Sequence, residues 1–386
     1  MRIPFFSWVF SWVSFVALSA CGVTADPPIV NGVHGDALTN TLQVTVRGES
    51  DGRSIAGASV DVGGAAVTTD ALGEATLTTT ASPVTLTVRA AGFVTEHWIG
   101  VDRQHASVAL ATPLPSRALT ASMSGGTADA VVSAATSLSI LRTSSTLGST
   151  SACAGGACVV MLSVATRSRD LDLVIVDAAS VRLASHVAVD ASDHVAVDLA
   201  SIPVGERLVT LDVTIPSAPG LEAVVGVPGL VTDHGVALLP SSATATTSLL
   251  APARVGSMAA NRLWYVASAR SADGSGESMI FDRDVGHDGA VHLPSAFLAI
   301  PSATASGSVG IDVDPEVELY VIEAFAGEGG ERTLVLHPSG THIDVPISLS
   351  SASSVVVRAV DTSRAGTDVD LAAAEHDATR MATLQL

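Results

Sequence analysis

The sequence predicts an all-β protein built from tandem β-sandwich domains. Short runs in which apolar and polar residues alternate recur along the chain, as at Leu42, Val44 and Val46. Gly, Asp, Ser or Pro separates these runs, and strands spaced in this way favour a sandwich or barrel over βαβ units. Hydrophobic residues make up 47% of the chain but aromatic residues only 4%, so Ala, Val, Leu and Ile must fill the core. Such small side chains suit thin β-layers.

The amino terminus has the pattern of a secretory signal. Residues 1–20 read MRIPFFSWVFSWVSFVALSA, with one cation, Arg2, before a long apolar run. This run ends in Leu-Ser-Ala-Cys, with the cysteine at position 21. The four residues resemble the lipobox of bacterial lipoproteins, which implies that Cys21 becomes the lipid-bearing first residue of the mature chain. The alternatives are an uncleaved membrane anchor and a plain signal peptide.

The lipobox resemblance also gives an expected location. Gly22 follows the cysteine, where an Asp would indicate retention at an inner membrane. The expectation is therefore a protein anchored to the bacterial outer membrane or cell surface, and more than one acyl chain would make that anchoring stable. Residues 21–39 are rich in Gly, Pro, Asp and Asn without periodicity, so they are predicted to form a flexible tether.

The other two cysteines predict a disulfide. Cys153 and Cys158 lie on either side of Ala-Gly-Gly-Ala, and glycine allows the chain to fold back so that the sulfur atoms meet. An exported protein with one such pair is expected to oxidise it. A metal site is the weaker interpretation, because two thiols without a nearby histidine supply half of a tetrahedral site.

Residues 40–112 contain an ordered set of strand and turn signals. Small residues at Ala56–Ala58 lie at the start of one predicted strand. Thr69, Asp70 and Gly73 form a turn pattern, and Gly92 precedes Phe93 before the later strands. This order resembles the carboxypeptidase regulatory-like domain, a seven-stranded sandwich of the transthyretin type. The resemblance implies a non-catalytic module that is common in exported proteins as a spacer or binding unit.

Strand-like runs continue beyond residue 112, and a Ser/Thr/Ala/Pro stretch near residue 250 divides them. We therefore expect a second β-rich domain at 113–250 and a third at 251–386. The local repeat HVAVDASDHVAVD places His186 and His194 at matched positions and is typical of a hairpin. The two histidines would then lie close together, but without a third ligand a structural role is favoured.

No catalytic motif stands out in the sequence. The segment GESDG at 48–52 matches Gly-x-Ser-x-Gly, but that motif is meaningful on a strand-to-helix turn, and here it lies between two predicted strands. A hairpin turn is the better interpretation. We therefore predict a protein that is not an enzyme.

The segment FDRDVGHDG carries the one candidate cation site. Asp282, Asp284 and Asp288 alternate with glycines, and calcium favours carboxylates clustered on a flexible loop. The EF-hand order is not kept, because Gly286 takes a ligand position and His287 replaces the required glycine. Calcium binding and a solvated acidic turn are the two interpretations, and no other cofactor is predicted.

A second acidic segment has carboxylates at every second position. Asp312, Asp314, Glu316 and Glu318 would share one face of a strand, where they would protect an exposed face or edge from aggregation. A cation site shared with the loop at 282–288 is the alternative interpretation.

Charge limits the possible partners. The formal net charge is −19, all nineteen cationic side chains are Arg, and no basic cluster could neutralise phosphates, so nucleic acid is excluded as a partner. The sequence favours a surface binding or scaffold protein anchored to the membrane through lipid, with a protein or carbohydrate ligand. An exported hydrolase with an accessory regulatory-like domain and a subunit of an envelope assembly are the alternatives.

Overall fold

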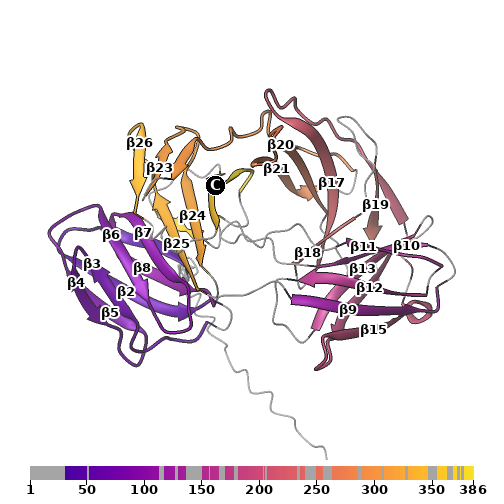
Figure 1. Cartoon of the computed structure of the whole chain (residues 1–386), viewed down its shortest axis with the longest axis horizontal. Coiled ribbons are helices and arrows are strands. Elements are labelled where there is room, and N and C mark those ends of the chain that lie inside the picture. Colours follow the sequence, from indigo (N-terminus) through magenta and orange to yellow (C-terminus); the bar gives the residue numbers. More distant parts are fainter. Residues whose placement is uncertain are drawn as a thin grey trace, which may run out of the picture.

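The computed structural model confirms the all-β class (Figure 1). Its described part contains twenty-nine β-strands arranged in six sheets. The residues that the structure describes are 31–49, 52–112, 117–126, 129–135, 150–155, 157–164, 170–177, 181–202, 204, 207–232, 235–239, 249–254, 263–285, 289–305, 308–326, 329–346, 354–362, 368–371, 374 and 378–386.

The first sandwich, unit 1, consists of two packed layers. Its strands are β2 (Thr41–Gly48), β3 (Ser59–Val62), β4 (Ala65–Thr68), β5 (Glu74–Thr78), β6 (Val84–Arg89), β7 (Thr95–Val101) and β8 (Arg103–Leu110). One layer has the order β8-β2-β5, and the other has the order β4-β3-β6-β7. Strands β2 and β8 are parallel, whereas the other neighbours within these two layers are antiparallel.

Unit 2 repeats this topology strand for strand. Its strands are β9 (Arg117–Ser124), β10 (Ala130–Ala134), β11 (Thr150–Cys153), β12 (Cys158–Val164), β13 (Asp170–Asp177), β14 (Val181–Ala188) and β15 (His194–Asp198). The layers are β15-β9-β12 and β11-β10-β13-β14, again with a parallel pair formed by the first and last strands. The prediction that the repeat HVAVD forms a hairpin is wrong, because β14 and β15 belong to different layers.

Unit 3 follows the same plan. It contains β16 (Arg207–Leu211), β17 (Glu222–Thr232), β18 (Gly235–Leu238), β19 (Leu249–Arg254), β20 (Leu263–Arg270) and β21 (Gly276–Val285). Strand β16 pairs with β19, and β18-β17-β20-β21 form the other layer. The parallel pairing of the first and last strands is reduced to one bridge, between Asp212 and Ala290.

Unit 4 has the same two layers with one difference. It contains β22 (Ala303–Ala305), β23 (Val309–Asp312), β24 (Leu319–Ala326), β25 (Gly329–Leu336), β26 (His342–Val345), β27 (Ser354–Asp361) and β29 (Arg380–Gln385). The layers are β22-β23-β26 and β25-β24-β27-β29. In unit 4 the neighbour of β23 is β22, which comes before it in the chain and runs antiparallel to it. In units 1 and 2 the corresponding neighbour is the last strand of the unit, and it runs parallel.

The structure therefore divides the chain differently from the sequence analysis, which expected two β domains after residue 112. Residue 250 lies inside β19, and one hydrophobic core of unit 3 joins Leu230 to Tyr265 across that position. Ordered structure also begins before residue 40. Strand β1 (Gly32–Ala37), within the segment predicted as a tether, pairs with β8 and with β28 (Val369–Asp370).

The cores follow from the alternation in the sequence. In β2, Leu42, Val44 and Val46 are buried, whereas the residues between them point away from the core. A turn before β5 is fixed by Asp70, whose Oδ1 accepts hydrogen bonds from the backbone N–H of Leu72 (2.8 Å) and Glu74 (2.9 Å).

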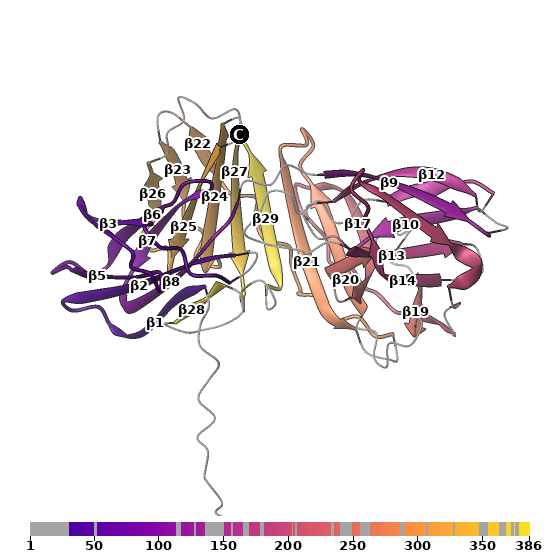
Figure 2. The ribbon, with the colours of Figure 1, turned by 90° about the horizontal axis from the view of Figure 1, so that it is seen from below.

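Units 3, 4 and 1 are joined edge to edge. Strand β21 of unit 3 pairs with β29 of unit 4, and β25 of unit 4 pairs in parallel with β7 of unit 1. These contacts produce one twelve-stranded sheet through units 3, 4 and 1 (Figure 2). Unit 2 packs on unit 3 through a shared core that includes Val174 and Leu211. The order in space is therefore 2-3-4-1, around the arch visible in Figure 1.

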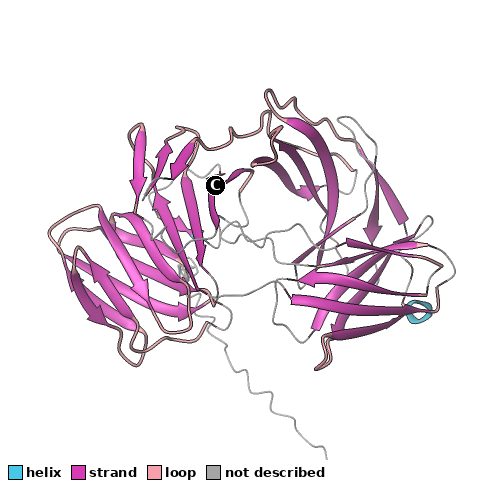
Figure 3. Ribbon diagram, in the orientation of Figure 1, coloured by secondary structure: helices cyan, strands magenta, loops and turns pink. Residues whose placement is uncertain are grey.

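A short 3-10 helix, η1 (Leu199–Ser201), ends unit 2 and is cyan in Figure 3. Asp198 caps it, because its Oδ1 accepts a hydrogen bond from the backbone N–H of Ala200 (3.1 Å).

Replacement of Gly100 by alanine is expected to weaken the junction between units 1 and 4. Gly100 lies in β7 with φ +93°, and a Cβ atom there would lie 2.5 Å from the backbone oxygen of Leu336 at the end of β25. Gly100→Ala should lower the free energy of unfolding by about 1–2 kcal/mol, since alanine is strained at positive φ and the strand must also move. Urea unfolding of the full chain measures this change.

Gly63→Ala is the matched control. Gly63 has φ +60°, but a Cβ atom there would have no neighbour within 4 Å, so that variant carries only the backbone strain. An equal or smaller loss for Gly100→Ala than for Gly63→Ala would contradict the close contact at the junction.

Candidate functional site

A polar groove lies on the outer face of unit 1. Strands β1, β8, β2 and β5 form its floor, and its volume is about 360 Å³. The inward residues of these strands belong to the core, so the outward residues are free to line the groove. The outward residues that line it are His34, Gln43, Thr45, Arg47, Glu74, Thr76, His105 and Ser107, and the core residues Val44, Ala75 and Ala106 also border it.

Strand register arranges the polar side chains in two rows. In the first row His105 lies opposite His34 on one side and Gln43 on the other, and Gln43 in turn lies opposite Thr76. The second row contains Ser107, Thr45 and Glu74, which are likewise direct cross-strand partners. Because successive outward residues on a strand are two positions apart, the rows lie about 7 Å from each other.

His34 and His105 form the most distinctive pair in the groove. Their rings are stacked, with 5.2 Å between centroids and 11° between planes. Burial lowers the pKa of His34 and the neighbouring His105 lowers it further, while Asp368 acts in the opposite direction. Gly35 makes room for this arrangement, because a Cβ atom at that position would lie 2.7 Å from Cδ2 of His105.

The chemistry of the groove suits binding. Its amide, hydroxyl and imidazole groups offer both donors and acceptors of hydrogen bonds, and Arg47 and Glu74 contribute opposite charges. The side chains stand on paired strands rather than loops, so their spacing is fixed. This site was not predicted from the sequence. The alternation in β2 shows that Gln43 and Thr45 point outward, but the alternation does not show that β1 and β8 complete the face.

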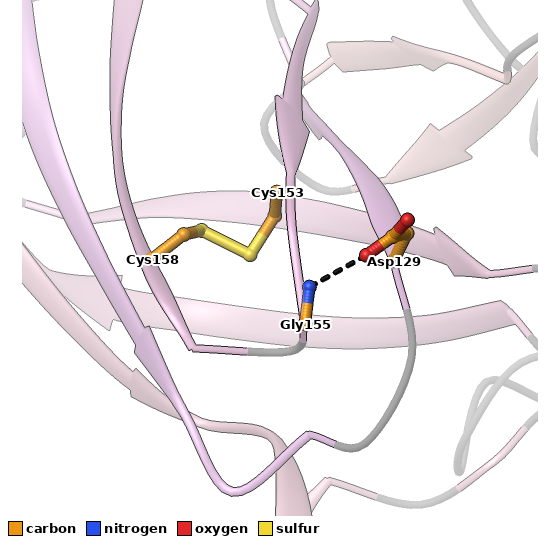
Figure 4. Close-up of a disulfide and its surroundings, with 4 residues drawn as sticks. All are labelled: Asp129, Cys153, Gly155 and Cys158. Atoms are coloured by element: carbon orange, nitrogen blue, oxygen red, sulfur yellow. Dashed lines mark hydrogen bonds between the residues drawn. A yellow bond between two sulfur atoms is a disulfide. The ribbon is translucent and has the colours of Figure 1, made fainter.

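The predicted disulfide is confirmed. Cys153 at the end of β11 and Cys158 at the start of β12 are bonded, with 5.5 Å between their Cα atoms (Figure 4). Asp129 supports the intervening loop, because its Oδ1 accepts a hydrogen bond from the backbone N–H of Gly155 (2.6 Å). Cys21, the predicted lipidation site, lies outside the described residues.

The acidic loop that suggested calcium is described only in part. Asp282 accepts hydrogen bonds from two backbone N–H groups, that of Asp284 at 3.1 Å and that of His292 at 2.5 Å. Asp288 lies outside the described residues, so calcium binding remains a prediction. Among the residues with defined positions, no group of three or more His, Cys, Asp and Glu side chains could hold a metal ion.

The alternating carboxylates at 312–318 do not share one strand face, contrary to prediction. Strand β23 ends at Asp312, and a turn follows in which the N–H of Val317 donates to the carbonyl of Asp314 (3.0 Å). Glu316 then pairs with Arg380 (2.8 Å). Pro315 lacks the N–H that a strand would need for pairing. The strand therefore does not continue through 312–318, although the acidic residues there alternate as they would in a strand.

Two histidines from the local repeat have separate partners. His186 Nδ1 lies 3.2 Å from Asp170 Oδ2, whereas His194 Nε2 lies 2.6 Å from Ser122 Oγ. Because β14 and β15 lie in different layers, the repeat does not bring the two histidines together in a ligand pair.

The junction between units 1 and 4 contains a buried row of alternating charges that sequence reasoning missed. Four side chains on the adjacent strands β7, β25, β24 and β27 form it, and we call it the charge ladder: Glu96, Arg332, Glu323 and Arg358. Arg332 Nε and Nη2 each lie 2.8 Å from Glu96 Oε1, and Arg358 Nη1 lies 2.9 Å from Glu323 Oε2.

Burial has opposite effects on the two kinds of group in the charge ladder. It raises the pKa of Glu96 to about 7, and the charge and hydrogen bonds of Arg332 act against that rise. It lowers the pKa of Arg358, while Glu323 acts against that fall. Each buried carboxylate therefore depends on its arginine to neutralise its charge, and each arginine depends on its carboxylate.

Comparison with known proteins adds no relative. No family model matches the chain, and no curated protein is significantly similar to it. Within the described residues, no helix is both long enough and apolar enough to cross a bilayer.

Proposed function

We propose that the chain is a lipid-anchored protein of the bacterial cell envelope that serves as a non-catalytic surface scaffold and presents a binding site on unit 1. The observation that carries the proposal is the twelve-stranded sheet. Its edge-to-edge pairing fixes unit 1 to unit 4 and unit 4 to unit 3, so the groove is held at a defined place on a large frame. Binding sites are commonly displayed in this way on rigid supports.

The proposed relation of unit 1 to carboxypeptidase regulatory-like domains is supported by its turn chemistry. Thr69 Oγ1 donates to the carbonyl of Ile55 (2.7 Å) and accepts from the N–H of Ala58 (2.9 Å). Gly73 has φ +76°, in the turn that Asp70 stabilises. These residues are the ones on which the sequence resemblance depends, and a non-catalytic role follows from that resemblance.

A rigid frame predicts a single distance between units 1 and 3. Spin labels at Thr85→Cys, on an exposed site of unit 1, and Ala272→Cys, on an exposed turn of unit 3, should give one narrow distance distribution in pulsed electron resonance. A broad distribution would show units that move independently and would contradict the scaffold. Two labels within unit 1 serve as the reference for the width expected of a rigid pair.

Lipid anchoring predicts a clear effect of Cys21→Ser. If Cys21 carries the lipid, the variant should accumulate as unprocessed precursor and lose the mass of the acyl chains. The parent protein should partition into detergent phase because two or more acyl chains hold it stably. Mass spectrometry and phase separation measure these outcomes, and a variant that is processed and partitions like the parent would refute the lipid anchor.

A further inference from the structure

We infer that the groove on unit 1 binds an uncharged, polyhydroxylated ligand, a short neutral oligosaccharide. This inference rests on the proposed function, since it names the ligand of the binding site that the scaffold presents. Its basis is the size of the groove, the kind of polar groups in it and the balance of their charges.

The size of the groove fits a small oligosaccharide. Its volume of about 360 Å³ lies within the range of small-molecule sites. Four strands at the usual spacing give a floor about 14 Å across, and the two polar rows add a second dimension of about 7 Å. A linear chain of a few sugar rings can therefore lie across the strands and contact both rows.

The polar groups match hydroxyl groups. Gln43, Thr45, Thr76 and Ser107 are neutral, and each offers at least one donor and one acceptor. A sugar hydroxyl also donates and accepts at once, so it can bond to two such neighbours on adjacent strands. The stacked imidazoles of His34 and His105 also line the groove, and the nitrogens of an imidazole can donate or accept a hydrogen bond.

The charge balance favours a neutral ligand. The groove contains one guanidinium, Arg47, and one carboxylate, Glu74, so their formal charges cancel. Burial and the neighbouring His105 shift the pKa of His34 downward, which favours the uncharged form of that imidazole. A phosphate or sulfate would find a single arginine near a carboxylate, whereas anion sites use clustered cations or backbone N–H groups.

Calorimetric titration of the full-length lipidated protein tests the inference. The protein is held in micelles of a detergent without a sugar headgroup, and the probes are maltotriose, cellotriose and triacetylchitotriose. At least one of the three should bind with a single site per chain. Gln43→Ala and His105→Ala should each weaken that binding by about tenfold, since each removes hydrogen bonds to the ligand.

Three controls make the outcome decisive. Thr85→Ala changes an exposed side chain on the other layer of unit 1 and should leave the affinity unchanged. A chelator should also leave it unchanged, because the groove groups bind the sugar directly. Inorganic phosphate should not bind. The inference is overturned if no trisaccharide binds at millimolar concentration, if only phosphate binds, or if both groove variants retain the parent affinity.

The two proposals fail separately. A Cys21→Ser variant that still binds sugar but partitions like the parent would refute the lipid anchor and leave the ligand assignment intact. Loss of all sugar binding in a protein with the expected single distance between units 1 and 3 would refute the ligand assignment and leave the scaffold intact.

Discussion

Arg332→Met should lower the free energy of unfolding by about 3–5 kcal/mol, because it leaves the buried carboxylate of Glu96 without its cation. Arg332 and Glu96 are 2% and 1% exposed, so water cannot replace the lost partner. Methionine has a similar length and no charge, and the variant therefore isolates the ion pair from the packing of the side chain. Urea unfolding of the full chain at about pH 8 measures the loss.

Arg270→Met supplies the matched control. Arg270 pairs with Glu277 at 3.3 Å, but its side chain is 64% exposed, and a surface pair of this kind contributes less than about 1 kcal/mol. If Arg332→Met and Arg270→Met lower the free energy of unfolding equally, the buried ion pair at the junction contributes no more to stability than an exposed one. The double variant Glu96→Gln with Arg332→Met should recover part of the loss, since no isolated charge then remains.

The deficit of Arg332→Met should also depend on pH. In the parent, burial raises the pKa of Glu96 to about 7, above its value in the unfolded chain. The stability that Glu96 contributes is therefore present below the unfolded pKa and is lost as the pH rises through the folded pKa. Without Arg332 the pKa of Glu96 should rise further, and protonation at about pH 5 should remove much of the deficit. A deficit that is the same at both pH values would contradict this account.

Loss of the disulfide in unit 2 should have the second largest effect. The double variant Cys153→Ala with Cys158→Ala should lower the free energy of unfolding by about 2 kcal/mol, because a short closed loop restricts the unfolded chain only modestly. Both residues are replaced because a single free thiol could form bonds with other chains. The unfolding midpoint of unit 2, followed in the full chain, gives the measurement.

Reduction provides an independent check on the disulfide. A reductant should lower the midpoint of the parent to that of the double variant and should leave the variant unchanged. If the parent keeps its midpoint when its thiols are shown to be free, the bond does not stabilise unit 2.

Local features of the fold could be predicted from the sequence. Alternation at Leu42, Val44 and Val46 identifies the buried face of β2, and the spacing of Cys153 and Cys158 predicts their bond. Each of these signals lies within a few residues, where chain geometry alone limits the outcome. The all-β class follows from many such signals taken together.

Long-range pairing could not be predicted in the same way. A period of two shows which side of a strand faces the core, but it does not identify the neighbouring strand. Glu96 and Arg332 are 236 residues apart, and nothing near either of them indicates the other. The groove depends on β1, β2, β5 and β8 meeting in one layer, so its two rows become visible only when the topology is known. The repeated topology of the four units was missed for the same reason.

The parallel pairing of β7 with β25 has a consequence for the order in which the protein is made. Unit 1 leaves the ribosome before β25 has been synthesised, and at typical rates the intervening 236 residues take roughly 10–50 s. During that interval β7 is an open edge, and Glu96 lacks both its arginine and the strand that covers it. A newly made unit 1 is therefore a template for incorrect strand pairing until the last unit arrives, and a holding chaperone would increase the yield of folded protein by covering that edge.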